Sequence, residues 1–451
     1  MSTIHRLRYA LSISLFATLG FACNDDTSGL GPDDSGLVPC LEGVDCPDDD
    51  TCEDGDDDCD EDPPPAPLWD EEGECGNGIV EGWEECDDGD QMPNSTCHNC
   101  LLQEQPTGEA LALPSVNEWA YFEPEGAVCR DGSQAGYAVS PGNDTSKVLF
   151  YFEGGGACFE AMNCAANPAN IPEEAKIPDH LGGIFDRSRE ENPFRDWTMV
   201  FLPYCTGDVF VGNSEGANID GGPQNQQFVG DRNMKIFLNQ ILPTFENVEH
   251  VVSTGISAGG LASVVNAKRL SRAFPDARVT VLDDGGPPLS TDVVSGCMQE
   301  HWKDLYNLKD TVLPECGWAC DKANDLLLPL TQDLVASNER IDMGLFSFIH
   351  DGTVRLLFTF GMNDCQMLPV PYMKETVLEE GLQQFREVMR QTGEESEDQT
   401  ALRTATYYAP GTHHVCINGP CFYDTVVDGV PLYEWTQDLL DQNFSDVGFT
   451  D

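Results

Sequence analysis

The sequence predicts an α/β domain with a mostly parallel sheet, and two observations carry this prediction. From residue 110 onward, short apolar segments typical of strands alternate with longer segments that have the apolar spacing of helices. One strand-like segment, 250–254, runs directly into a turn of small residues that is followed by a helical pattern over 261–274. A strand that turns straight into a helix is the building unit of such sheets.

The individual strands are expected where apolar and β-branched residues cluster. We expect them, in chain order, at 147–152, 199–202, 248–254, 277–282 and 355–360, with helices between them.

The turn Gly255-Ile256-Ser257-Ala258-Gly259 is the first candidate functional element. A Gly-x-Ser-x-Gly turn between a strand and a helix forces its serine into a strained, exposed position, because only small residues let the two elements approach closely. Ser257 is therefore a candidate nucleophile. The alternative is a glycine-rich corner with an ordinary serine, so partner residues must decide.

The amino-terminal residues are typical of an export signal. Arg6 and Arg8 precede an apolar run over 9–22 that is too short to cross a bilayer. We expect residues 1–22 to be a signal peptide. Cys23 directly after this run resembles a bacterial lipoprotein acylation site, which predicts a secreted or cell-surface protein with a possible lipid anchor.

The cysteine count agrees with an oxidising compartment. Apart from Cys23, the other 18 of the 19 cysteines fall into three even groups: four in 40–59, four in 75–100 and ten beyond 128. Even groups are what disulfides within modules require. An unpaired or cleaved-off Cys23 is the alternative to a lipidated one.

The charge distribution divides the chain further. Residues 23–74 are rich in Asp, Glu, Pro and Gly with few large apolar side chains, which predicts a disordered acidic tether. Residues 75–102 resemble a single cysteine-rich repeat of secreted bacterial proteins, and 110–451 form the main domain. The formal net charge of −56 argues against nucleic acid as a partner.

A serine nucleophile needs a histidine to take its proton and a carboxylate to orient that histidine. In α/β-hydrolase order the acid follows the second strand after the nucleophile. With 355–360 as that strand, Asp364 is the predicted acid, and Asp283 and Asp284 are its rivals. For the base, His414 on a late loop is preferred to the adjacent His413.

The run Gly154-Gly155-Gly156 after the strand at 147–152 is the candidate oxyanion loop. Glycines let backbone N–H groups approach a substrate closely, and the amide of Ala258 would complete the set of donors. A tight turn without a role in chemistry is the alternative for a glycine run alone.

Residues 120–423 resemble the pectin acetylesterase and Notum family of serine carboxylesterases, whose fold is α/β-hydrolase-like. Five blocks occur in the same order, and they begin at Cys129 (CRDGSQAGY), Phe152 (FEGGGACF), Pro203 (PYCTGD), Gly255 (GISAGG) and Asp364 (DCQ). The resemblance implies a triad of Ser257, Asp364 and His414, an oxyanion hole from Gly155, Gly156 and Ala258, and neither metal nor cofactor. It also implies the disulfides Cys158–Cys164 and Cys129–Cys205.

The implied activity is removal of an O-acetyl group from a polysaccharide, with acyl transfer to water. A Notum-type deacylase of lipid or lipid-modified protein is the alternative enzyme, and a surface protein that only binds glycan is the alternative without catalysis. Two positions depart from the family, which commonly has an aromatic residue at Gly156 and another after the Asp-x-Gly that here reads Asp284-Gly285-Gly286. Both positions are expected to border the substrate pocket.

Overall fold

The computed structural model describes residues 97–98, 101–102, 108–178, 181–245, 247–316, 325–336, 338–362, 365, 372–395 and 403–449. All of them belong to the unit Glu71–Asp451. The predicted signal peptide, Cys23, the acidic tether and most of the cysteine-rich repeat lie outside the described residues. Within the described part, no helix has the length and apolar character needed to cross a bilayer.

The centre of the described unit is an eight-stranded sheet in the order β12-β11-β10-β9-β5-β6-β4-β3. The six strands from β12 to β6 are mutually parallel, while β4 and β3 add to the β6 edge in antiparallel pairing. The strands are β3 Ala120–Phe122, β4 Tyr137–Ser140, β5 Asp144–Phe152, β6 Trp197–Leu202, β9 His250–Ile256, β10 Arg278–Asp284, β11 Ile341–Phe348 and β12 Thr404–Ala409.

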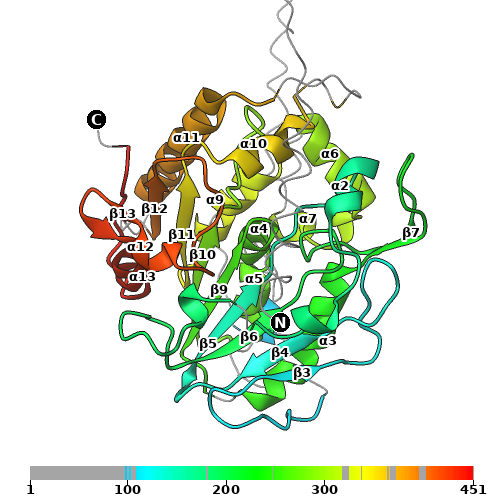
Figure 1. The fold of residues 1–451 in the computed structure, drawn as a ribbon, viewed down its shortest axis with the longest axis vertical. Coiled ribbons are helices and arrows are strands. Elements are labelled where there is room, and N and C mark those ends of the chain that lie inside the picture. Colours follow the sequence, from blue (N-terminus) through cyan, green and yellow to red (C-terminus); the bar gives the residue numbers. More distant parts are fainter. Residues whose placement is uncertain are drawn as a thin grey trace, which may run out of the picture. The chain divides into compact units, whose positions relative to one another are not determined.

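Helices lie on both faces of this sheet (Figure 1). They are α2 Ala161–Ala166, α3 Gly230–Ile241, α4 Ala258–Val265, α5 Ala267–Ala273, α6 Gly296–Leu305, α7 Leu313–Cys316, α9 Leu327–Ala336, α10 Gly352–Thr359, α11 Glu375–Glu395, α12 Cys421–Asp424 and α13 Leu432–Leu440. Single 3-10 turns occur at Glu173–Ala175, Gly183–Phe185, Leu242–Thr244 and Leu308–Asp310. Short two-stranded pairs form from β1 Cys97–His98 with β2 Leu101–Leu102, β7 Ser214–Ala217 with β8 Gln226–Phe228, and β13 Val426–Val427 with β14 Val430–Pro431.

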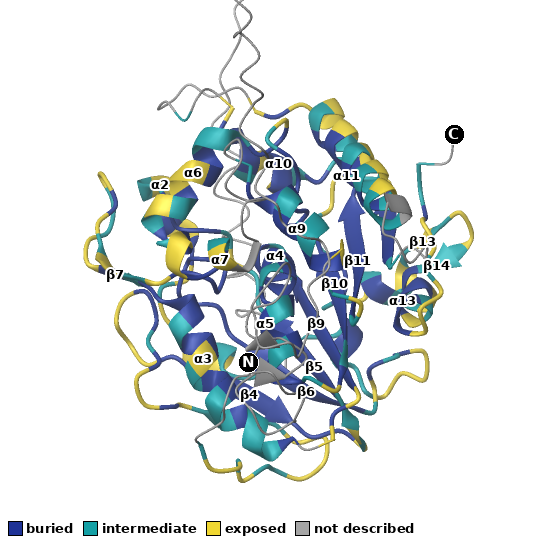
Figure 2. Ribbon diagram, turned by 180° about the vertical axis from the view of Figure 1, so that it is seen from behind, coloured by how far each residue is buried: buried dark blue, intermediate teal, exposed yellow. Residues whose placement is uncertain are grey.

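Alternation along the strands creates two separate apolar clusters. Val148, Phe150 and Phe152 of β5 face the cluster that contains the helices α3, α4, α5, α9 and α11, whereas Leu149 and Tyr151 face the cluster built on α12 and α13. Parallel strands covered on both sides are largely buried, and here β6, β11 and β12 are buried at every residue. Figure 2 shows these strands buried behind helices whose outer faces are exposed.

The predicted fold is confirmed: a mostly parallel sheet flanked by helices, with disulfides in the domain. The strands expected at 147–152, 199–202, 248–254 and 277–282 correspond to β5, β6, β9 and β10. The helix expected over 261–274 is two helices, α4 and α5, which meet at Asn266.

The strand expected at 355–360 is wrong, because this segment lies mainly in the helix α10. A six-residue apolar run fits a buried strand and a buried helical turn equally well by pattern alone. Asp351 favours the helix over the strand, because its side chain accepts hydrogen bonds from the N–H groups of Thr353 and Val354 and so caps the helix. The second strand after the nucleophile is instead β11.

The strand order places a topological switch point between β5 and β9. From β5 the chain continues to β6 on one side, and from β9 it proceeds through β10, β11 and β12 on the other side. Loops that follow the carboxyl ends of parallel strands meet at one edge of the sheet, and a switch point opens a crevice there. The functional site is therefore expected at the ends of these strands.

Candidate functional site

Ser257 stands between the last residue of β9 and the first residue of α4 with φ 57° and ψ −122°. This is the strained turn that the sequence pattern predicts. The flanking glycines are required sterically, because a Cβ on Gly255 or Gly259 would overlap the carbonyl of Phe152 at the end of β5. The N–H of Ser257 donates to the carbonyl of Asp284 at 2.7 Å, which joins the turn to the end of β10.

His414 lies on the loop after β12, and its Nδ1 atom is 2.7 Å from Oδ2 of Asp351. Asp351 is fully buried, while the His414 side chain is 22% exposed. The other ring nitrogen, Nε2, is buried and has no hydrogen-bond partner among the described residues. A ring whose Nδ1 is held by a carboxylate and whose Nε2 is free of partners has the arrangement of a general base.

Asp351 follows β11 and is held on both of its oxygens. Oδ2 contacts His414, and Oδ1 accepts the N–H groups of Thr353 and Val354 at 2.8 and 2.9 Å. The amino terminus of α10 therefore stabilises the carboxylate that faces the imidazole. Because the second strand after the nucleophile is β11, Asp351 follows the strand after which α/β-hydrolase order places the acid.

Asp364, the predicted acid, lies outside the described residues, so its role stays a prediction. His413, the alternative base, is exposed and packs its ring against Phe348 with ring centroids 5.5 Å apart. The described interactions of His413 therefore include no carboxylate partner like that of His414.

Asp284, a rival acid, anchors the loop that carries His414 rather than the ring itself. Its Oδ2 accepts the N–H groups of Cys416 and Ile417, both at 2.7 Å. Burial raises the pKa of Asp284 to about 7, although these N–H groups and nearby His414 favour the charged form. Because the same residue accepts the Ser257 N–H through its carbonyl, Asp284 links the serine turn to the histidine loop.

The second rival, Asp283, points into the protein. It is fully buried, and its Oδ1 accepts the N–H of Gly286 at 2.9 Å. Burial raises its pKa well above the usual range. The described contacts give Asp283 a role in the turn after β10 and no contact with the imidazole of His414.

The predicted oxyanion loop follows β5 and lies beside Ser257. A Cβ built on Gly154 would sit 3.2 Å from the Cβ of Ser257, and Ala258 begins α4 directly after the serine. Gly156 has φ +73°, and a Cβ built there would meet no described atom within 4 Å. The space beside Gly156 is thus open.

Both predicted disulfides are confirmed. Cys158–Cys164 closes the chain just beyond the glycine loop, and Cys129–Cys205 joins the segment before β4 to the segment after β6. Two further disulfides are present in the described part, Cys297–Cys365 and Cys416–Cys421. The latter closes the chain two residues after His414.

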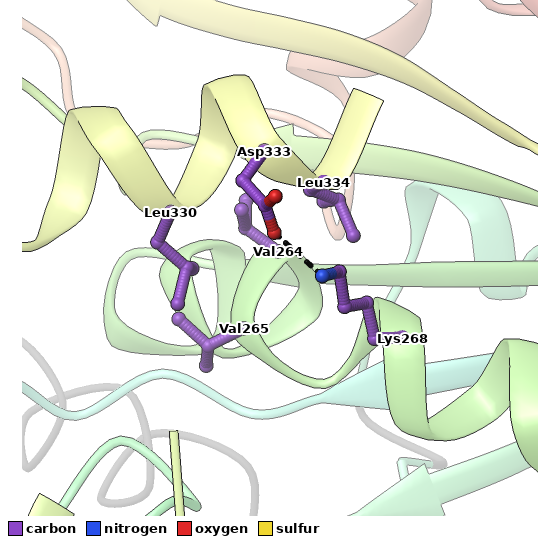
Figure 3. Close-up of a pocket in the computed structure, with 6 residues that line it drawn as sticks. All are labelled: Val264, Val265, Lys268, Leu330, Asp333 and Leu334. Atoms are coloured by element: carbon purple, nitrogen blue, oxygen red, sulfur yellow. Dashed lines mark hydrogen bonds and ion pairs between the residues drawn. The ribbon is translucent and has the colours of Figure 1, made fainter. Parts of the chain in front are cut away.

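A small pocket between α4, α5 and α9 is separate from these residues (Figure 3). Its walls are mainly apolar, and Lys268 and Asp333 form an ion pair at 2.5 Å across it. Val264 lies about 10 Å along α4 from Ser257, at 1.5 Å per residue. Among the described residues, no three or more His, Cys, Asp or Glu side chains gather as a metal site.

Residues 117–316 match the family model described as pectinacetylesterase. The predicted resemblance to pectin acetylesterases is confirmed over these residues. Pectin acetylesterase 5 of Arabidopsis thaliana is 29% identical over 194 residues, which are 41% of this chain and 45% of that protein. Palmitoleoyl-protein carboxylesterase NOTUM of Mus musculus is 28% identical over 170 residues, 35% of this chain and 33% of that protein. The aligned region therefore spans less than half the length of these relatives.

The solved structure of the Wnt deacylase Notum from Drosophila, crystal form II, superposes with a TM-score of 0.53 at 18% identity. The match covers 72% of this chain and 93% of that chain. At this identity the superposition establishes the shared fold. The match to the family model ends at residue 316, so Asp351 and His414 lie beyond it.

Proposed function

We propose that this protein is a serine carboxylesterase that removes O-acetyl groups from a polysaccharide. The observation that carries the proposal is the pairing of His414 with buried Asp351 at the same sheet edge as the strained Ser257 turn. The partnerless Nε2 of His414 leaves that nitrogen available for the serine hydroxyl. The similarity to pectin acetylesterases and Notum carboxylesterases supports the same reaction class.

In this mechanism the Oγ of Ser257 attacks the ester carbonyl carbon while Nε2 of His414 takes the hydroxyl proton. Asp351 keeps the ring in the required tautomer and stabilises its positive charge. The tetrahedral intermediate collapses as His414 returns the proton to the departing glycan oxygen. Water then attacks the acyl-serine with His414 again accepting a proton, which releases acetic acid and restores Ser257.

Main-chain N–H groups of Gly155, Gly156 and Ala258 would stabilise the oxyanion of both intermediates. The glycine loop lies beside the Cβ of Ser257, which supports this assignment. Removing one such donor from a serine hydrolase slows the chemical step about 100- to 1000-fold. The proposed mechanism therefore requires the N–H groups of this loop as well as the side chains of Ser257, His414 and Asp351.

The substrate is proposed from the resemblance and from charge. The chain beyond residue 100 holds 52 acidic and 21 basic residues, so an anionic pectin backbone would be repelled at low salt. A neutral acetylated glycan is therefore as suitable a substrate as pectin. Rates on neutral and anionic acetylated polymers at low salt test this point, because equal rates on both would remove the electrostatic objection.

The alternative enzyme, a deacylase of a long-chain fatty acyl ester, is favoured by the open space beside Gly156. Nitrophenyl esters of two to sixteen carbons separate the two. A preference for the acetate ester supports deacetylation of a polysaccharide. A preference for acyl chains of eight or more carbons excludes a pocket limited to acetyl groups.

The decisive test of the reaction class is covalent labelling of the intact protein by a fluorophosphonate. We expect one label per chain that disappears in Ser257→Ala, together with loss of ester hydrolysis. Absence of labelling in the wild type would favour the glycan-binding protein without catalysis, and labelling that persists in Ser257→Ala would exclude Ser257 as the labelled nucleophile. The proposed location is the cell exterior, with Cys23 as a lipid anchor, and mass spectrometry of the amino-terminal peptide tests it.

A further inference from the structure

The side chain of Asn167 bonds to the backbone of the glycine loop. Its Nδ2 atom donates to the carbonyl of Gly155 at 2.9 Å and to the carbonyl of Gly156 at 3.2 Å. Asn167 is 6% exposed, so these bonds are sheltered from water. The loop itself has no side chains with which to hold its shape, because three successive glycines form it.

These two bonds determine which way the loop N–H groups point. A peptide unit is planar and trans, so its N–H lies opposite its C=O. When Asn167 holds the carbonyl of Gly155, the N–H of Gly156 must face away from Asn167. The same reasoning turns the N–H of Ala157 away when the carbonyl of Gly156 is held.

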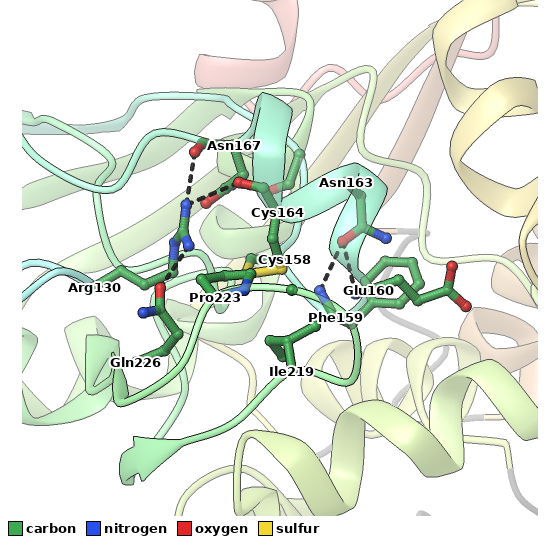
Figure 4. Close-up of a disulfide and its surroundings, with 12 residues drawn as sticks. Arg130, Cys158, Phe159, Glu160, Asn163, Cys164, Asn167, Ile219, Pro223 and Gln226 are labelled. Carbon is green, nitrogen blue, oxygen red and sulfur yellow. Dashed lines mark hydrogen bonds between the residues drawn. A yellow bond between two sulfur atoms is a disulfide. The ribbon is translucent and has the colours of Figure 1, made fainter.

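Asn167 is itself fixed from two directions. It is the C-cap of α2, where its N–H donates to the carbonyl of Asn163 at 3.0 Å. The guanidinium of Arg130 donates to the carbonyls of Cys164 and Asn167 at 3.1 and 2.8 Å. Figure 4 shows Arg130 reaching the carboxyl end of α2 beside the disulfide. A cation at this end of a helix meets free carbonyls and the negative end of the helix dipole.

Packing alone does not explain a buried arginine at position 130. It is 3% exposed, and the acceptors of its described hydrogen bonds are neutral oxygens, including Oε1 of Gln226 at 2.6 Å. A buried guanidinium without a bonded carboxylate is costly, so the contacts it makes must be specific. Those contacts converge on the short helix whose last residue bonds the glycine loop.

We infer that Asn167, held by Arg130, is a positioning residue that orients the Gly155–Gly156 peptide unit, and with it the proposed oxyanion donor Gly156 N–H, and that it also fixes the adjoining Gly156–Ala157 unit. This inference rests on the proposed esterase function for its catalytic consequence. Donors that are already oriented before the reaction stabilise the developing charge without the free-energy cost of reorganisation. Without Asn167 the glycine loop would sample several conformations and present its N–H groups only part of the time.

The kinetic test uses the full chain with Asn167→Ala and Asn167→Asp, which both remove the two bonds. We expect kcat to fall about 100-fold with KM changed by less than about threefold, because the oriented donors act on the transition state. A boronic acid, which mimics the tetrahedral intermediate, should lose affinity in parallel with kcat/KM. Arg130→Met should lower kcat in the same direction by about tenfold, because Asn167 then keeps its bonds but loses its support.

Asn170→Ala is the matched control. Asn170 lies three residues further on, is exposed, and bonds Asp131 at 3.0 Å. It should keep kcat, KM and the melting temperature of the wild type. The inference is overturned if Asn167→Ala keeps kcat within about threefold of Asn170→Ala, or if KM rises as much as kcat falls.

Backbone ¹⁵N relaxation supplies a measurement that needs no activity. In Asn167→Ala the order parameters of the Gly156 and Ala157 amides should fall from about 0.85 in the wild type to below about 0.6, while those of β9 are unchanged. If the wild type hydrolyses no ester, the proposed function fails, and the order parameters still decide the positioning role. Unchanged order parameters at Gly156 and Ala157 overturn it.

Discussion

Asp351 and His414, 63 residues apart in the chain, meet at 2.7 Å between Oδ2 and Nδ1. The carboxylate is fully buried and is held in addition by two N–H groups at the start of α10. Such a carboxylate cannot turn to solvent without leaving those donors unpaired. The contact therefore fixes the orientation of the histidine ring at the edge of the sheet where Ser257 lies.

Replacing Asp351 tests which carboxylate serves the triad. Asp351→Asn keeps the shape but favours the wrong ring tautomer, and we expect kcat to fall about 10⁴-fold. Asp364→Asn should keep kcat within about threefold. Initial rates on nitrophenyl acetate measure both. A large loss in Asp364→Asn together with a small loss in Asp351→Asn would return the acid to Asp364.

Replacing each histidine of the adjacent pair separates the base from its neighbour. His414→Ala should reduce kcat by about 10⁴-fold or more, because His414 takes the serine proton in the proposed mechanism. His413→Ala removes an exposed ring that packs on Phe348 and should cost less than about tenfold. The rate of fluorophosphonate labelling reports the same difference independently of substrate. Equal losses in the two variants would argue against His414 as the sole base.

Asp284 should make the folded state less stable as the pH rises. Burial raises its pKa from 3.8 to about 7 in the folded chain, so between these values the native state binds more protons than the unfolded state. Under that condition the free energy of unfolding decreases with rising pH. Glu153, whose pKa burial also raises to about 7, contributes in the same direction.

Asp284→Asn isolates the contribution of this residue. The amide oxygen can still accept the N–H groups of Cys416 and Ile417, but it does not titrate. We expect the loss of stability between pH 4.5 and pH 7.5, measured by urea unfolding, to shrink by more than about 1 kcal/mol. Asp220→Asn, at an exposed position, is the control and should leave the pH dependence unchanged. An identical slope in wild type and Asp284→Asn would contradict the assignment.

The Cys158–Cys164 disulfide is predicted to support activity more than stability. Its short ring, with a sequence separation of 6, contributes about 2 kcal/mol in the chain-entropy account. Replacing both cysteines with alanine should therefore lower the melting temperature modestly but reduce kcat strongly, because the chain beside the oxyanion loop is released.

The pair Cys297–Cys365 closes a longer segment, with a sequence separation of 68, and serves as the comparison. Its removal should cost about 4 kcal/mol of stability while leaving kcat of the folded fraction close to that of the wild type. Thermal melts and initial rates measured on the same samples distinguish the two pairs. A larger loss of kcat in the Cys297 and Cys365 variant would reverse the prediction.

Residues 355–360 were predicted as a strand but lie mainly in the helix α10. Residues 355–360 form a short apolar run, and nothing within the run separates a strand from a helix. The buried positions of α10, Val354, Arg355, Phe358 and Thr359, have helical spacing, and Asp351 caps the helix three residues before the first of them. An Asp followed by Gly-Thr-Val was the available signal, since Asp is a favoured N-cap.

The sequence by itself determined the features that local chemistry dictates. Alternating apolar segments specified the parallel sheet, and small residues around Ser257 specified a turn that no larger side chain can adopt. The family motifs were equally visible in the chain, and the resemblance that they carry implied the pairs Cys158–Cys164 and Cys129–Cys205. The sheet pattern, the serine turn and the motifs each follow from residues close together in sequence.

Only the tertiary structure decided which distant side chains meet. The pairing of Asp351 with His414, the anchoring of the histidine loop by Asp284, and the support of the glycine loop by Asn167 join residues from different elements. Such contacts depend on strand order and on where each helix begins, because a shift of a few residues at a strand end changes which side chain reaches the site. The sequence placed the acid at Asp364 because the helical segment 355–360 was predicted as a strand; the folded chain pairs His414 with Asp351, and the role of Asp364 stays a prediction.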